Sequence, residues 1–269
     1  MIEEYYKNFD TFDKKAVFVF DLEMGGIGDF LKYFSYALLY CMNNNIKMYY
    51  LLNNNPLIKY IKLKFNKFYI TQNEVVNTKN IHALNDLDNI SYDDIINNIF
   101  YIIHPTNMYY NFDIYEKINF VNKIIDFTDE VKETQMKLTE NLKNYISIHL
   151  RLGDKFLETD KSFMVCPNDT REYNESNIFT FIEKNTDKNI IFFCDNKSYK
   201  NKIKEKYNFI NITDLEVGHT SFRNTSDSQI FGSVTEFYIL TKSTEIYVAS
   251  NSGFSMVASK FNNVPLYNI

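Results

Sequence analysis

The sequence predicts an α/β protein with mainly parallel sheets. Short runs of β-branched and aromatic residues recur along the chain, and stretches with apolar residues at helical spacing separate them. Several of these runs are apolar throughout, which is typical of strands buried on both faces of a parallel sheet. With 269 residues, 45% of them hydrophobic, the chain can bury a core in one large domain or in two lobes.

The amino-terminal half opens with a predicted strand, glycine loop and helix. Residues 16–20 are all apolar, and from Phe30 apolar side chains follow helical spacing up to Cys41. The intervening residues hold three of the seven glycines of the chain: Gly25, Gly26 and Gly28. Such glycines let the backbone approach a ligand and direct free N–H groups to it at the helix start, although a tight turn between strand and helix would need them too. The loop has neither the Gly-Lys-Ser/Thr of a P-loop nor the third glycine of a dinucleotide fingerprint.

The rest of this half contains fewer clear elements. Residues 47–52 and 98–104 are predicted strands. The helices and strands of the polar stretch between them are not assigned. Residues 113–121 and 128–142 are predicted helices. We interpret the second helix as the connection between two lobes, 1–140 and 141–269.

Two acidic pairs lie in the unassigned stretch. Asp86 with Asp88, and Asp93 with Asp94, superficially resemble the Asp-x-Asp that binds a divalent metal and a nucleotide diphosphate in some glycosyltransferases. Neither pair follows an apolar strand. We therefore interpret both as solvated faces and expect no metal.

The carboxyl-terminal half repeats the alternation of strand and helix. The predicted strands are residues 145–150, 189–194, 209–213 and 244–249. The predicted helices are residues 173–184, 198–207 and 233–242, and a last helix begins at Met256. Residues 155–172 and 214–228 are predicted loops.

The first strand of this half ends in residues that suit an anionic ligand. His149 and Arg151 stand at its end, and Asp154 follows Gly153. Ligands bind at the carboxyl ends of strands in layered α/β domains, and a guanidinium can bind two phosphate oxygens at once. Arginine is scarce, with Arg151, Arg171 and Arg223 alone among 29 basic residues, so each needs a local reason. Taken singly, His149 could be a core histidine, Arg151 could pair with an acid, and Asp154 could cap the turn.

Further candidates follow the later strands. Asp195 ends the second strand, where it could also cap the next helix, and His219 and Arg223 lie in a polar loop long enough to be functional. Small polar residues precede the last helix, where backbone N–H groups can bind an anion or an ordinary N-cap can form. The residues of this segment are Ser250, Asn251, Ser252, Gly253 and Phe254.

Composition excludes other classes of protein. A net charge of −5 and a pI near 5.5 argue against a nucleic-acid binder. Cys41, Cys166 and Cys194 are odd in number and far apart, as expected for reduced thiols. Residues 1–15 lack the pattern of a signal peptide, and no uncharged apolar run reaches 18 residues. We therefore expect a cytoplasmic protein without a membrane anchor, and its oligomeric state stays open.

These segments resemble the fucosyltransferase superfamily, and most of all the α-1,2-fucosyltransferases. Residues 149–154 are similar to the His-x-Arg-x-Gly-Asp signature, which is usually His-x-Arg-Arg-x-Asp in the α-1,2 group. Leu152 replaces the second arginine, which leaves other linkages open. The glycine loop resembles a Gly-Gly-x-Gly-Asn segment of that group, with Asp29 in place of the asparagine, and residues 250–255 resemble its Ser-Asn-Ser-Ser-Phe-Ser segment.

The resemblance implies a site for GDP-fucose. By carry-over, residues 250–254 would hold the diphosphate, Arg151 its β-phosphate, and His149 and Glu236 the nucleoside, with Asp195 in a supporting role. It also implies a GT-B-like fold, with two Rossmann-like lobes and an interlobe cleft, in which residues 1–140 bind the acceptor and residues 141–269 bind the GDP-sugar.

The implied reaction is a metal-independent, inverting transfer of fucose to a hydroxyl of a glycan. Asp29 is the expected base, and no cofactor is expected beyond the donor substrate. The alternatives are a GDP-sugar-binding protein without turnover, a transferase that uses another nucleotide sugar, and a protein O-fucosyltransferase.

Overall fold

The computed structural model describes residues 1–52, 55–108, 118–158 and 166–269. They form two compact units, Met1–Met24 with Asp29–Asp126, and Gly25–Gly28 with Phe127–Ile269. Helix α6 (Asp129–Thr139), the predicted connection, is therefore part of the second unit. No helix within the described ranges combines the length and the apolar character that a membrane crossing needs.

The first unit is built on a parallel sheet with strand order β2-β1-β5-β4. Its strands are β1 (Lys15–Val19), β2 (Lys47–Leu51), β4 (Thr78–Asn80) and β5 (Phe100–Ile103). Phe18 of β1 packs its ring against Phe30 and Phe34 of helix α2 (Ile27–Asn43), while Val17 and Val19 pack with Leu51 in a second cluster. Burial on both faces explains why β1 is apolar after Lys15.

Short elements complete this unit. The helices are α1 (Ile2–Asn8), α3 (Tyr92–Ile96) and α5 (Val121–Ile124), and strands β3 (Ile61–Leu63) and β6 (Ile125–Phe127) form a separate pair. The 3₁₀ turns are Phe9–Thr11, Pro56–Lys59, Asn66–Phe68, Gln72–Glu74, Leu84–Asn89 and Pro105–Met108. Of the helix expected over residues 113–121, residues 113–117 lie outside the described residues.

The acidic pairs of this unit bond within the protein. Asp86 accepts hydrogen bonds from the backbone N–H groups of His82 and Ala83. Asp94 is buried, pairs with Lys79 and accepts a hydrogen bond of 2.6 Å from the Tyr101 hydroxyl. The prediction of a solvated face was therefore wrong for Asp94, because its carboxylate joins α3 to β4 and β5.

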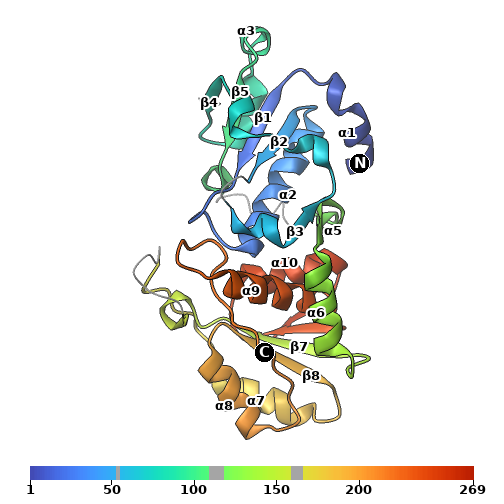
Figure 1. Ribbon diagram of the computed structural model, residues 1–269, viewed down its shortest axis with the longest axis vertical. Helices are drawn as coiled ribbons and strands as arrows, with labels where there is room; N and C mark the ends of the chain where they lie inside the picture. The colour runs from blue at the N-terminus through green and yellow to red at the C-terminus, as the bar shows by residue number, and fades with distance from the viewer. Residues whose placement is uncertain (53–54, 109–117, 159–165) are drawn as a thin grey trace. The chain divides into compact units, whose positions relative to one another are not determined.

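The second unit has a parallel sheet with strand order β10-β9-β7-β8. Its strands are β7 (Ile146–Leu150), β8 (Ile190–Cys194), β9 (Glu245–Val248) and β10 (Leu266–Asn268). Its further helices are α7 (Glu175–Lys184), α8 (Lys197–Lys206), α9 (Asp227–Leu240) and α10 (Gly253–Asn262), with a 3₁₀ turn at Asp154–Phe156. Figure 1 shows α7 and α8 on one face of this sheet, and α6, α9 and α10 on the other.

Most predicted elements of this unit form, with differences at their ends. Helix α9 begins at Asp227 rather than residue 233, because Ser226 and Gln229 form a capping box there. Helix α10 begins at Gly253 rather than Met256, with Ser252 as its N-cap. The strand expected over residues 209–213 was wrong. It is reduced to one bridge between Asn211 and Ile191, after which the Thr213 carbonyl binds the Lys200 ammonium group.

Candidate functional site

The candidate site lies in the second unit, where strands β7, β8 and β9 end. Side chains along β7 alternate between the two faces of the sheet. Ile146, Ile148 and Leu150 join the aliphatic core under α7 and α8. Ser147 and His149 point to the opposite face, where Ser147 bonds to Ser243 and His149 stacks on Phe254 of α10. The polar residues of β7 therefore lie on the side of α9 and α10.

Arg151 stands just after β7 and is held by two carboxylates. Its Nη2 bonds to Asp154, and its Nη1 lies 3.1 Å from Asp195 Oδ2. The side chain of Arg151 is 18% exposed, against 9% for Asp154 and 7% for Asp195. The alternative in which Arg151 pairs with a nearby acid is thus realised, but at the strand end where a ligand would bind.

The two carboxylates are themselves placed by backbone groups. Asp195 accepts hydrogen bonds from the N–H groups of Leu152, at 2.8 Å, and Gly153, at 3.0 Å. It therefore joins the ends of β7 and β8, and Asn196 caps α8 in its place. Burial raises the pKa of Asp154, and the Arg151 guanidinium acts in the opposite direction.

Ser250 joins the end of β9 to the same point. Its hydroxyl accepts a hydrogen bond from the Arg151 N–H and donates one to the Arg151 carbonyl, both at 2.8 Å. After Asn251, Ser252 accepts a hydrogen bond from the Phe254 N–H at the first turn of α10. Arg151 and Ser250, which are 99 residues apart in sequence, thus meet at the edge of one sheet.

His149 is buried beside this edge, with an exposed fraction of 5%. Its ring stacks on Phe254 at 5.4 Å, and its Nδ1 has no hydrogen-bond partner among the described residues. At Nδ1, the described residues do not provide the backbone carbonyl expected for a core histidine. Burial, followed by the charge of Arg151, lowers the pKa of His149 to about 3, so its imidazole is neutral near pH 7.

The glycine loop reaches the same region. Gly25 has a φ of 125°, which favours glycine, and the Ile27 N–H donates to Thr220 Oγ1 at 3.0 Å. A Cβ on Gly28 would lie 3.0 Å from the backbone of Gly253 and Phe254. Gly28 is the second residue of α2 rather than part of the loop before it, and it lies against the first residues of α10.

His219 lies in the loop between α8 and α9. Ser233 of α9 exchanges two hydrogen bonds with Gly218, and the His219 ring stacks on Phe222 at 4.1 Å. A Cβ on Gly26 would lie 3.9 Å from His219 Nε2. Burial, followed by the charge of Arg151, lowers the pKa of His219 to about 3, which disfavours a phosphate-binding cation at this position. Arg223 of the same loop is exposed.

Glu236 of α9 is bonded deep inside the unit. Its Oε1 accepts a hydrogen bond from Thr213 and lies 2.9 Å from Lys200 Nζ. Lys200 has a side chain that is 1% exposed, and sequence analysis missed it because it is one of several lysines in α8. Burial raises the pKa of Glu236, and Lys200 opposes this effect. The expected contact of Glu236 with a nucleoside stays a prediction.

Asp29, the expected base, follows Gly28 in the first turn of α2 and is partly exposed. It is counted with the first unit, whereas Gly25–Gly28 belong to the second. Its role as a base stays a prediction.

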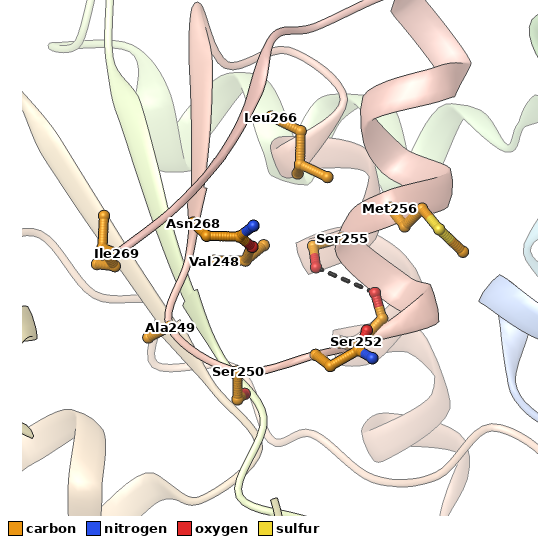
Figure 2. A pocket seen from close by; sticks show the side chains of 10 residues that line it. Val248, Ala249, Ser250, Ser252, Ser255, Met256, Leu266, Asn268 and Ile269 are labelled. Carbon is orange, nitrogen blue, oxygen red and sulfur yellow. Dashed lines mark hydrogen bonds between the residues drawn. The ribbon is translucent and has the colours of Figure 1, made fainter. Parts of the chain in front are cut away.

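A cavity of about 440 Å³ opens beside the α10 start. Figure 2 shows Ser252 and Ser255 on one side of it, and Val248, Asn268 and Ile269 on the other. Ser255 donates a hydrogen bond to the Ser252 carbonyl. The described residues contain no group of three or more His, Cys, Asp or Glu side chains that could hold a metal ion.

The fold is that of the GT-B class: mixed α/β, with a parallel sheet in each of two units. No protein-family model matches the sequence, and no curated protein matches it either. Solved structures of similar fold include the Bradyrhizobium α-1,6-fucosyltransferase NodZ soaked with GDP-fucose, with a TM-score of 0.57, 10% identity and coverage of 92% of this chain and 93% of that one.

Two further structures show the same likeness. FUT1 of Arabidopsis thaliana in complex with GDP has a TM-score of 0.54 and 12% identity, and the match covers 99% of this chain and 73% of that one. POFUT1 in complex with GDP-fucose has a TM-score of 0.56 and 11% identity, and the match covers 95% of this chain and 98% of that one.

Proposed function

We propose that this protein is a glycosyltransferase of the fucosyltransferase superfamily that transfers fucose from GDP-fucose to a hydroxyl of a glycan. One observation carries the proposal. Arg151 and Ser250, which the resemblance assigns to the same diphosphate, bond to each other at the adjoining ends of β7 and β9. The fold likeness to structures that contain GDP-fucose or GDP supports it.

Local chemistry agrees with a diphosphate at this position. Gly28 lies against the backbone of Gly253 and Phe254 at the start of α10, and the amino terminus of a helix favours negative charge. Arg151 supplies a guanidinium next to this helix start. His149 adds a buried neutral imidazole whose Nδ1 is unpaired among the described residues, a group that a ligand could satisfy.

The proposed mechanism is inverting transfer in which the nucleotide diphosphate leaves. As the bond to the sugar breaks, negative charge grows on the diphosphate, and Arg151 with the N–H groups at the α10 start would stabilise it. Asp29 would accept the proton of the acceptor hydroxyl. An α-1,2 linkage follows from the resemblance alone, whereas one structurally similar protein is an α-1,6 enzyme.

The test is release of GDP from GDP-fucose across a panel of glycan acceptors. Arg151→Ala should lower the rate about 100-fold or more, because removal of one charge-stabilising donor costs about 3 kcal/mol in the transition state. Arg171→Ala is the matched control, since Arg171 pairs with Asp169 and is 42% exposed. Equal loss in both variants would refute the assignment of Arg151.

The same panel separates the alternatives. Binding of GDP-fucose without GDP release in the presence of any acceptor would indicate a binding protein without turnover. Competition among GDP, UDP and ADP would identify a different nucleotide sugar. A polypeptide acceptor in the panel would reveal protein O-fucosylation.

A further inference from the structure

The charges around Arg151 create a problem for an anionic ligand. Arg151 and Arg171 lie among three carboxylates, Asp154, Asp169 and Asp195, so this cluster carries one more negative charge than positive. Both Nη groups of Arg151 already contact a carboxylate. A diphosphate that binds Arg151 must therefore compete with at least one of them.

The two carboxylates that hold Arg151 are not equivalent. Asp195 also accepts hydrogen bonds from the N–H groups of Leu152 and Gly153, so it keeps partners if Arg151 moves. The Asp154 carboxylate is buried, and within the described part of the chain the one hydrogen bond found for it comes from Arg151. Asp154 is thus the weaker competitor for Arg151. Without Arg151, the negative charge of the buried Asp154 carboxylate would be poorly stabilised.

We propose that Asp154 is an exchangeable counter-ion. A diphosphate takes its place at Nη2 of Arg151 while Asp195 retains Nη1, and the Asp154 carboxylate then takes up one proton from solvent. Asp154 is accordingly a positioning residue of the empty site that releases Arg151 to the donor. The inference rests on the proposed function, since it takes the ligand to be a nucleotide diphosphate.

The surroundings of Asp154 favour this proton uptake. Burial, Asp169 and Asp195 raise its pKa, whereas Arg151 and Arg171 lower it. Exchange removes the Arg151 contact and adds a nearby anion, and both changes raise the pKa further. Affinity for the donor should therefore fall as pH rises from the pKa of Asp154 in the free protein to its pKa in the complex.

Two neutral histidines are rival acceptors of the proton that is taken up on binding. His149 on β7 and His219 in the loop before α9 both feel the charge of Arg151, and an incoming anion would raise their pKa as well. The experiment must therefore assign the proton to one residue.

The experiment is calorimetric titration of the full chain with GDP-fucose, without acceptor, in two buffers of different protonation enthalpy. This donor has no terminal phosphate that titrates near neutral pH. Across a series of pH values, wild type should show a range in which binding takes up a sizeable fraction of a proton. Asp154→Asn, which keeps the shape of the side chain, should take up almost none and bind several-fold to about tenfold tighter at pH 7.5.

Two controls locate the effect. Asp169→Asn removes a carboxylate of the same cluster that does not contact Arg151, and it should retain proton uptake with an affinity within about twofold. His219→Gln should also retain the uptake. Thermal unfolding of each variant shows that it is folded.

Each outcome decides the proposal. Equal or weaker binding by Asp154→Asn, uptake that survives in this variant, or no uptake by wild type would overturn it and leave the proposed function intact. Loss of uptake in His219→Gln would assign the proton to that histidine instead. If wild type does not bind GDP-fucose at all, the proposed function fails, and the inference fails with it.

Discussion

The Ser250 hydroxyl bonds to both the N–H and the carbonyl of Arg151, at 2.8 Å each, and so joins the end of β9 to the end of β7. Pairing of the strands themselves stops earlier, at Val248 opposite His149. One side chain therefore continues the contact between the strands beyond the sheet, and it fixes the backbone from which the Arg151 side chain departs.

Ser250→Ala should lower the free energy of unfolding by about 1–3 kcal/mol, because two backbone groups of Arg151 lose their partner in a buried position. Chemical denaturation measures the change. Ser198→Ala is the control, since that hydroxyl is exposed, and it should cost less than about 0.5 kcal/mol. Equal costs would show that the Ser250 hydroxyl is replaced by water.

Gly28→Ala should destabilise the protein by about 1–3 kcal/mol and weaken binding of GDP-fucose. Its Cβ would meet the backbone of Gly253 and Phe254 at 3.0 Å, and this backbone would have to shift. Gly26→Ala is the matched control, because the nearest atom to its Cβ would be Thr220 Oγ1 at 3.4 Å. Thermal unfolding and donor titration of both variants test the difference, and a tolerated Gly28→Ala would contradict the close packing.

The buried His149 should make the protein less stable as the pH falls. Its pKa is lowered from 6.5 to about 3, so between these values the unfolded chain binds the proton that the folded chain does not. Stability is thus fully present above pH 6.5 and is lost toward pH 3, with a slope of up to about 1.4 kcal/mol per pH unit. Denaturation of wild type and His149→Gln from about pH 5 to 6.5 measures this slope.

The slope should be smaller in His149→Gln than in wild type. His82→Gln, which replaces an exposed histidine, should give the slope of wild type. An unchanged slope in His149→Gln would mean that His149 is protonated in the folded protein.

Lys200→Met should lower the free energy of unfolding by about 3–5 kcal/mol, because it leaves the buried Glu236 carboxylate without its cation. The double variant Lys200→Met/Glu236→Leu should recover part of this loss. The control is Lys202→Met in the same helix, whose side chain is 55% exposed and pairs with Glu175, and it should cost less than about 1 kcal/mol. Similar losses for Lys200→Met and Lys202→Met would show that Lys200 is solvated.

The order of strands and helices around the site could be predicted from local patterns. β8 is a short apolar run, and β7 alternates aliphatic residues with Ser147 and His149, so both strands are evident in the sequence. Helix starts were less well predicted, because the capping residues Ser226 and Ser252 were placed within polar loops. The partial strand at Asn211 shows a further limit, since a side chain from another element, Lys200, binds the backbone that follows it.

The sequence by itself determined the fold class and the polar residues that end the strands, because the alternation of apolar runs and the chemistry of His149, Arg151 and Ser250 are local properties. Only the tertiary structure decided which residues contact one another. Arg151 pairs with Asp154 and Asp195, Glu236 pairs with Lys200, and Gly28 lies against Gly253 and Phe254. The physical reason is that the local sequence around a charged group or a hydroxyl does not specify which distant residue it will contact. Which carboxylate reaches which cation is set by the register of β7 with β8 and β9 and by the burial that follows from packing.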